Sequence, residues 1–197
     1  MSDSSKDVRR QVLDTAHKII STKAYSAVGL NEILKASGVP KGSFYYYFGT
    51  KEAFGVELLE GYFDDYIAHI EPILTQSDKP AVARVADYFN YWLDTQSSSD
   101  LAARCLVVKL GAEVCDLSEA MRTSLEKGTS RVIARLTQVL EEGVTDASLP
   151  AHFDPANLAA TLYHLWLGAS MHSKITRNSE PLRQALVTTK QLLGLSK

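Results

Sequence analysis

The stretch Gly38-Val-Pro-Lys-Gly-Ser-Phe-Tyr-Tyr-Tyr-Phe-Gly-Thr-Lys51 combines a helix-ending glycine with a short aromatic helix. Phe44 and Phe48 are four residues apart, so on a helix they share one face and can anchor it. The three tyrosines at positions 45–47 spread over about 200° of a helix and cannot all face one core. Part of the run is therefore expected to face outward, flanked by lysines. Exposed hydroxyls and cations suit phosphate groups and base edges.

Helical periodicity extends over the rest of the chain. Gly38 is expected to end a second short helix in a left-handed conformation, and Thr50 to cap a fourth helix. Asp154-Pro155 and Glu180-Pro181 are expected to start the last two helices. Alternating strand patterns and Asn-Gly hairpin signals are absent from the sequence. We therefore predict an all-α fold of about nine helices, with a small three-helix head over residues 1–50 and a larger helical body over residues 51–197.

Composition points to a globular protein of 197 residues, 45% hydrophobic and 22% charged. Residues 1–51 hold eight Lys or Arg and four Asp or Glu, although the whole chain has a net charge of -2. A basic head on an acidic body suits nucleic-acid binding through the head, although chance would also produce so modest an excess.

No apolar run approaches the roughly 20 residues of a membrane span, and the first residues lack a signal-peptide core. We expect a cytoplasmic protein, with no membrane association and with its two cysteines as thiols.

A helix, a tight turn at Gly38 and a second helix form the helix-turn-helix signature. The surrounding residues resemble the N-terminal domain of TetR-family repressors. This resemblance implies a homodimer formed through the last two helices, bound to a palindromic double-stranded DNA operator. It also implies that residues 51–197 sense an effector and dimerise, and that no cofactor is used. The residues that carry the resemblance are Tyr25, Leu30, Glu32, Ile33, Gly38, Val39, Lys41, Gly42, Ser43, Phe44, Tyr45, Tyr47, Phe48, Lys51 and Glu52.

The resemblance also implies roles for single residues of the head. Tyr45 matches a tyrosine that contacts bases or sugars, whereas Tyr46 and Tyr47 match phosphate-binding positions. Tyr47 could instead pack inward with only its hydroxyl exposed. Val28 and Gly29 depart from the family pattern, because a hydroxyl that would cap the second helix is missing. The predicted DNA-binding residues are Lys41, Gly42, Ser43, Tyr45, Tyr46, Tyr47 and Lys51.

The helix that starts near Leu158 carries more apolar surface than one small body needs to bury. We therefore expect part of it to lie in the dimer interface. The residues of this apolar stripe are Leu162, Leu165, Trp166 and Ala169.

Cys105 is the residue of the predicted helical body whose side-chain reactivity most strongly suggests a function. Arg104 precedes it and Lys109 follows four residues later, so the two cations are expected to lower the pKa of the thiol. An inert, buried thiol is the alternative. The flanking sequence resembles electrophile-responsive TetR repressors, which implies release from DNA by electrophiles or oxidants through Cys105. The same resemblance implies that Lys174 approaches the thiolate, although a surface lysine would look the same.

Two other functions compete with a cysteine sensor. A flat hydrophobic or aromatic effector could bind non-covalently, in a pocket lined by Tyr88, Trp92, Met121 and Trp166. An enzyme is not expected, because the sequence has no P-loop, nucleophile elbow or dinucleotide-binding glycine motif. The five histidines show no i, i+4 spacing suited to a metal, so we predict neither a catalytic residue nor a metal site.

Overall fold

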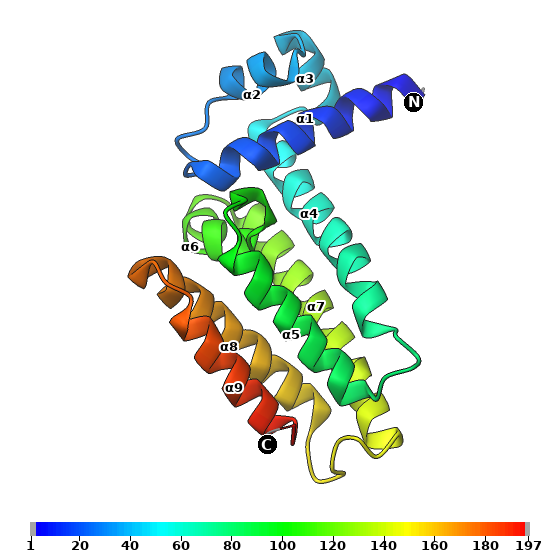
Figure 1. Cartoon of the computed structure of the whole chain (residues 1–197). Coiled ribbons are helices and arrows are strands. Elements are labelled where there is room, and N and C mark those ends of the chain that lie inside the picture. The colour runs from blue at the N-terminus through cyan, green and yellow to red at the C-terminus, as the bar shows by residue number, and fades with distance from the viewer. Residues whose placement is uncertain (1–2, 196–197) are drawn as a thin grey trace. The chain divides into compact units, whose positions relative to one another are not determined.

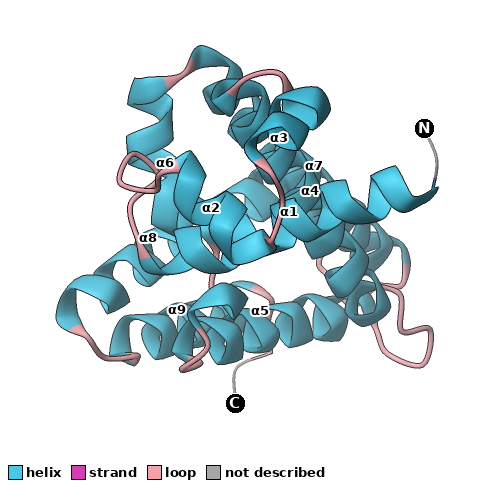
Figure 2. Ribbon diagram, turned by 90° about the horizontal axis from the view of Figure 1, so that it is seen from above, coloured by secondary structure: helices cyan, strands magenta, loops and turns pink. Residues whose placement is uncertain are grey.

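The computed structural model describes residues 3–195, and this part of the chain is helical without a strand (Figures 1 and 2). The predicted all-α fold is confirmed. A 3-10 helix, Leu101–Ala103, precedes α6. The α-helices are α1 Asp3–Thr22, α2 Leu30–Ser37, α3 Lys41–Phe48, α4 Lys51–Leu74, α5 Ala81–Ser97, α6 Leu106–Leu117, α7 Glu119–Thr145, α8 Pro155–Thr176 and α9 Glu180–Leu192.

The helices group into two compact units. The first contains the residues up to Phe63 together with Ser99–Gly128, and the second contains Asp64–Ser98 together with the residues from Thr129 onward. Helices α4 and α7 therefore each contribute to both units. The first unit joins the helix-turn-helix to α6, which lies far away in the sequence. The predicted functional boundary after residue 50 stays a prediction.

Local sequence signals account for most helix ends. Gly38 ends α2 with a φ of 68°, and its N–H donates to the Leu34 carbonyl. The Thr50 hydroxyl accepts from the Ala53 N–H at 3.0 Å, and Asp154 caps α8 through the N–H groups of Ala156 and Asn157. These are the caps that the sequence predicted.

The segment directly before α6 is not α-helical. The Asp100 side chain accepts from the Ala102 N–H and starts only a short 3-10 turn. Arg104 is then extended, with φ -79° and ψ 155°. Cys105 is consequently the N-cap residue of α6 rather than part of a continuous helix.

Aromatic side chains and close helix contacts fill the core of the first unit. Phe44 is fully buried, and its ring lies 5.0 Å from that of Phe48 and 5.2 Å from that of Phe54, between centroids. Further along α4, a Cβ atom added to Gly128 of α7 would lie only 2.0 Å from the Phe63 ring. Glycine at position 128 therefore lets α7 approach Phe63 closely.

In the second unit, α8 packs against α9, and α5 also contacts α9. Trp92 Nε1 donates to the Ser170 hydroxyl at 3.0 Å, and Trp166 Nε1 donates to the Thr189 hydroxyl at 2.9 Å. Both indoles are buried with their polar edges hydrogen-bonded, as buried polar groups require.

The predicted dimer stripe on α8 needs a correction. Leu162, Trp166 and Ala169 are buried within the subunit, because this face of α8 helps to form the core of the second unit. Leu165 is half-buried. The exposed large apolar residues of α8 and α9 are Met171, Ile175 and Val187.

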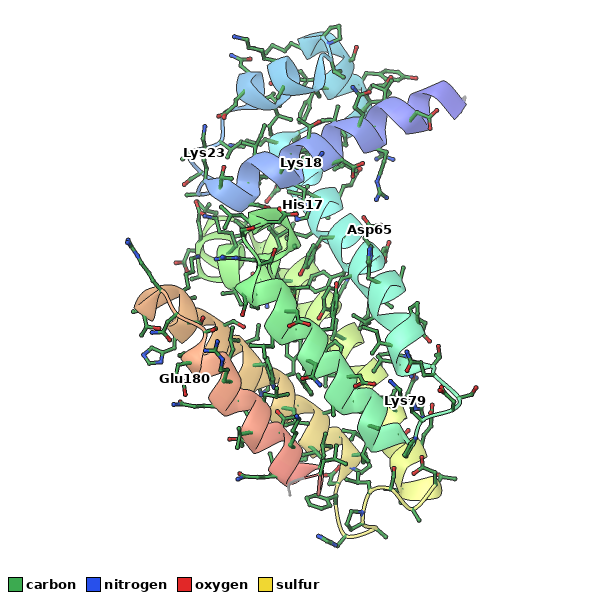
Figure 3. The ribbon with its side chains drawn as sticks, viewed as in Figure 1. His17, Lys18, Lys23, Asp65, Lys79 and Glu180 are labelled. Carbon is green, nitrogen blue, oxygen red and sulfur yellow. The ribbon has the colours of Figure 1, made fainter. Side chains whose placement is uncertain are left out.

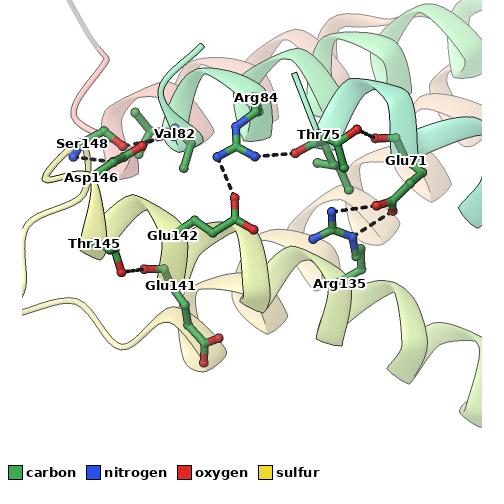
Figure 4. A network of polar contacts seen from close by, with 12 residues as sticks. Glu71, Thr75, Val82, Arg84, Arg135, Glu141, Glu142, Thr145, Asp146 and Ser148 are labelled. Carbon is green, nitrogen blue, oxygen red and sulfur yellow. Dashed lines mark hydrogen bonds and ion pairs between the residues drawn. The ribbon is translucent and has the colours of Figure 1, made fainter. Parts of the chain in front are cut away.

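Buried charge in the second unit is paired (Figure 4). The Arg84 guanidinium donates to the Leu74 carbonyl at 2.6 Å and pairs with Glu142 at 2.7 Å. Arg135 makes two hydrogen bonds of 2.9 Å to Glu71, and these hydrogen bonds hold the pKa of the Glu71 carboxyl below its ordinary value. Among the residues described, no helix is both long and apolar enough to cross a membrane.

Candidate functional site

Helix α3 presents a polar, aromatic surface on one side and an anchored apolar surface on the other. Tyr46 is 78% exposed and Tyr45 is 50% exposed, whereas Tyr47 is half-buried. Lys41 and Gly42 are exposed at the start of the helix, and Ser43 is half-buried. The expectation that part of the tyrosine run faces outward is confirmed. The contacts that these six residues make with DNA remain predictions.

Lys51, the seventh predicted DNA-binding residue, also braces the head internally. Its ammonium donates to the Val28 carbonyl at 2.9 Å and lies 5.2 Å from the centre of the Tyr25 ring. The Tyr25 hydroxyl donates in turn to the Lys51 carbonyl at 3.1 Å. Burial, followed by the nearby Glu52 charge, raises the pKa of Tyr25 to about 12, so its phenol stays protonated at neutral pH.

The unusual Val28-Gly29 pair has the predicted consequence. Gly29 occupies the N-cap position of α2, with extended backbone and no side-chain cap hydrogen bond. Val28 is buried instead, with 1% of its surface exposed. The Lys51 ammonium donates a hydrogen bond to the Val28 carbonyl. A side chain of α4 therefore stabilises this turn in place of a hydroxyl within the turn.

Cys105 lies at the N-terminus of α6, in the first unit, where it meets α4. It is a free thiol, and the residue is half-buried. Burial raises the pKa of the thiol, whereas the N–H groups of Val108 and Val107 and the Tyr62 hydroxyl lower it to a smaller extent. The expectation of a lowered pKa is therefore wrong. Desolvation of the thiol outweighs the hydrogen-bond donors at the helix start. The positive charge of Lys109 lowers the pKa of Glu113 instead.

The Tyr62 hydroxyl links Cys105 to neighbouring groups. It accepts a hydrogen bond of 3.2 Å from the Leu106 N–H, which leaves its own proton for another acceptor, such as the Cys105 sulfur. The His17 ring of α1 packs 5.8 Å from the Tyr62 ring, between centroids. Figure 3 labels His17 on α1, next to Lys18. Cys105 thus contacts a residue of α4 that itself touches α1.

Lys174 and Cys115 lie elsewhere. Lys174 is exposed in the last turn of α8, in the second unit, so its approach to Cys105 stays a prediction. Cys115 is an exposed free thiol near the end of α6.

The residues of the predicted effector pocket are divided between the units. Tyr88, Trp92 and Trp166 cluster in the second unit, with ring centroids 6.0 Å apart for both Tyr88–Trp92 and Trp92–Trp166. Met121 belongs to the first unit, where a Cβ atom added to Gly55 would lie 2.7 Å from its sulfur. The three aromatic residues are core residues, each at most 2% exposed, and an effector pocket there remains untested.

An open, shallow pocket of about 620 Å³ lies in the second unit, in the region that Figure 4 shows. Its lining is formed by Arg84, Gln138, Glu141, Glu142, Thr145 and Asp146, none of which was a predicted effector residue.

Sequence reasoning missed Glu113. Its carboxylate accepts hydrogen bonds from the N–H groups of Tyr25 and Ser26 at 2.9 and 2.8 Å, and from the Ser26 hydroxyl at 2.5 Å. Burial raises the pKa of Glu113, but these hydrogen bonds and the Lys109 charge outweigh it and hold the pKa below its ordinary value. Its partners are 87 and 88 residues away in the sequence, so no local pattern marks this glutamate.

Comparison with known proteins assigns both parts of the chain. Residues 12–58 match the family described as bacterial regulatory proteins, tetR family. Residues 81–189, more than half of the chain, match the tetracyclin repressor-like C-terminal domain.

The chain belongs to the TetR family. Within this family, it is 40% identical to the HTH-type transcriptional repressor NemR of Escherichia coli strain K12, over 95% of this chain and 94% of NemR. It is 31% identical to the HTH-type transcriptional repressor DhaR of Mycobacterium sp. strain GP1, over 94% of this chain and 92% of DhaR. The crystal structure of E. coli NemR in its reduced form superimposes with a TM-score of 0.89 and 41% identity, covering 94% of this chain and 96% of that one.

The TetR-family assignment fixes the general function. The protein is a TetR-type transcriptional repressor similar to NemR. TetR-family repressors bind DNA and act as dimers.

Proposed function

We propose that this repressor binds a palindromic operator as a homodimer and leaves it when an electrophile or oxidant modifies Cys105. Residues Lys41 to Tyr47 would enter the major groove, and a two-fold dimer would place two such helices about 34 Å apart, one turn of DNA. The proposal assigns the protein a regulatory role and no catalytic one.

The observation that carries the sensor proposal is the position of Cys105. It is the N-cap residue of α6 and lies against Tyr62 of α4. Helix α4 directly follows α3, the second helix of the helix-turn-helix and the proposed recognition helix. The similarity to NemR, whose solved structure is described as a reduced form, adds support for a redox-dependent state. A buried thiol that gains a bulky substituent must displace its neighbours, because protein interiors have little spare volume.

The chemistry with N-ethylmaleimide is a simple addition. The Cys105 thiol loses its proton to water, and the thiolate sulfur then forms a bond to one alkene carbon. The alkene electron pair moves to the other carbon, and that carbon takes a proton from water. The added ring is expected to displace the Tyr62 hydroxyl or the start of α6, because both contact the sulfur. Modification is therefore expected to shift the balance between conformations that bind DNA well and poorly.

The dimer interface that we propose lies on α8 and α9. Ile175 is 69% exposed, Val187 is 56% exposed and Met171 is 42% exposed. Exposed large apolar side chains on two packed helices suit a subunit interface, and TetR-family repressors act as dimers.

A direct test measures operator binding by fluorescence anisotropy, with a duplex from the promoter beside the protein's own gene. N-ethylmaleimide is expected to release wild type and Cys115→Ser from DNA, but not Cys105→Ser. N-ethylsuccinimide, which has the same shape without the reactive alkene, is expected to release none of them. Normal release of Cys105→Ser by N-ethylmaleimide would exclude Cys105 as the sensor.

A non-covalent effector is the second candidate, and the raised pKa of the buried Cys105 thiol favours it. This alternative predicts that N-ethylsuccinimide, or another unreactive hydrophobic or aromatic compound, releases DNA from wild type and from Cys105→Ser equally. The same assay therefore separates the two candidates.

A further inference from the structure

Glu113 connects α6 to the turn that precedes the helix-turn-helix. Each carboxylate oxygen accepts one of two consecutive backbone N–H groups, from Tyr25 at 2.9 Å and from Ser26 at 2.8 Å. The Ser26 hydroxyl adds a third hydrogen bond, at 2.5 Å. Charge-assisted hydrogen bonds of this kind are stronger than neutral ones. One side chain of α6 therefore holds a segment more than eighty residues away in the sequence.

The turn that Glu113 holds is continuous with the DNA-binding head. It is closed by hydrogen bonds from the Ala27 N–H to the Ala24 carbonyl and from the Val28 N–H to the Tyr25 carbonyl. Lys51, at the start of α4, binds the Val28 carbonyl at 2.9 Å. A movement of the turn consequently reaches both the start of α2 and the start of α4.

A second hydrogen bond ties the end of α6 to the same part of α4. The Ser118 hydroxyl, directly after α6, donates to Glu52 at 2.5 Å. The C-terminal half of α6 is thus hydrogen-bonded at two points to the segments before and after the helix-turn-helix, α2 and α3.

Cys105 is the N-cap residue at the opposite end of α6. Cys105, Lys109 and Glu113 are spaced by four residues, so they follow one side of the helix. Eight residues at about 1.5 Å each place the Glu113 backbone about 12 Å along the axis from Cys105. A helix of 12 residues has little internal freedom, so a displacement at its N-terminus is transmitted to its other end.

We propose that Glu113 is a positioning residue that couples the state of α6 to the placement of the DNA-binding head. The inference rests on the proposed function, because it takes modification of Cys105 as the event that moves α6. In this mechanism the carboxylate leaves the Tyr25–Ser26 turn when α6 shifts, and the turn then loses its fixed position relative to α4. The coupling passes through the turn after α1, in addition to the contact between Cys105 and Tyr62.

The test compares wild type with Glu113→Gln, whose amide cannot accept hydrogen bonds on both of its terminal atoms. Glu126→Gln is the matched control, since Glu126 is an exposed carboxylate that pairs with Arg122 at 2.9 Å. Each protein is measured for operator affinity before and after reaction with N-ethylmaleimide, and for its melting temperature. Allosteric coupling is commonly about 5- to 150-fold in affinity. We expect such a ratio for wild type and Glu126→Gln, and a ratio close to one for Glu113→Gln.

The change in hydrogen exchange that modification causes in wild type is a readout that a merely structural role of Glu113 would not move. In wild type, N-ethylmaleimide is expected to speed exchange in peptides that contain the Tyr25 and Ser26 amides. In Glu113→Gln these amides should exchange quickly before modification and change little after it.

The outcomes separate the two proposals. If wild type releases DNA on modification and Glu113→Gln keeps the same affinity ratio, even with a lower melting temperature, Glu113 is only a structural residue and the inference is wrong. If wild type does not release DNA, the proposed function fails, and the inference fails with it.

Discussion

The exposed side of α3 concentrates hydroxyls and one cation, Lys41, at the start of the recognition helix. A lysine that binds a phosphate releases a condensed counterion, so binding weakens as salt rises, by about 0.9 in the log–log slope for each contact. The slope of operator affinity against salt concentration therefore tests the predicted phosphate contact of Lys41.

We predict that Lys41→Ala weakens operator binding and lowers the salt slope by about 0.9 for each lost phosphate contact. The measurement is operator affinity by anisotropy at several salt concentrations. Lys79→Ala serves as the control, because Lys79 pairs with Asp87 at 2.6 Å in the second unit. An unchanged slope for Lys41→Ala would show that Lys41 does not bind phosphate.

The buried setting of Cys105 leads to a prediction about pH. The thiolate is the reactive form, and burial raises the pKa of this thiol above its ordinary value of 9.0. In a Cys115→Ser background, the rate of alkylation by iodoacetamide should therefore still be rising above pH 9. Tyr62→Phe removes a donor to the thiolate and should lower the rate at neutral pH further. A plateau below pH 8 would contradict the raised pKa.

Residues whose role depends on neighbours in the sequence could be predicted, and those whose role depends on distant ones could not. The spacing of Phe44 and Phe48 was enough to predict which side of α3 is buried. The cations near Cys105 suggested a lowered pKa, but burial reversed the direction, and burial is a property of the fold. Glu113 gave no signal, because its partners come from another part of the chain.

Gly128 of α7 lies directly against the Phe63 ring of α4. A methyl group there would lie 2.0 Å from a carbon of the Phe63 ring, so Phe63 or the helix must move. Overpacking of this kind typically costs about 1–3 kcal/mol, whereas alanine gains about 1 kcal/mol over glycine in helix propensity.

We predict that Gly128→Ala lowers the free energy of unfolding by up to about 2 kcal/mol, the difference between these two effects. Gly61→Ala in α4 is the matched control, since nothing lies within 4 Å of an added Cβ atom there. That variant should gain up to about 1 kcal/mol. Urea unfolding followed by circular dichroism measures both, and equal stabilisation of the two variants would contradict the close contact.

Helix positions were largely predictable because caps and terminators are local. Gly38, Thr50 and Asp154 perform the roles expected of them. The segment before α6 was not predictable in the same way. The side chain of Asp100 stabilises a 3-10 turn there, and the extended Arg104 delays the helix to Leu106.

At the scale of the whole molecule, the apolar residues of α8 fall into two groups, one buried within the subunit and one exposed on its surface. Trp166 faces inward, and its N–H donates to the Thr189 hydroxyl on α9. The periodicity of α8 alone could not reveal this contact with another helix. Counting apolar residues along α8 therefore predicted an interface from residues that the subunit itself buries. The exposed residues Met171, Ile175 and Val187 of α8 and α9 form the interface that we propose.

We predict that Ile175→Glu or Val187→Glu converts the dimer to a monomer, since a buried unpaired charge at an interface is costly. Sedimentation velocity measures the change, and operator affinity should fall with it. Leu117→Glu is the control, because Leu117 is also a large exposed apolar residue, at 55%, but belongs to α6. A stable dimer in both interface variants would place the interface elsewhere.

The first unit combines residues up to Phe63 with Ser99–Gly128, and this has a consequence for protein synthesis and engineering. During translation, the hydrogen bonds from the Tyr25 and Ser26 N–H groups to Glu113 cannot form until about ninety further residues have been synthesised. A DNA-binding fragment cut after α4 would lack that carboxylate permanently. A chimera that grafts this head onto another repressor should therefore include residues 99–128 as well, so that the transplanted turn keeps its partner.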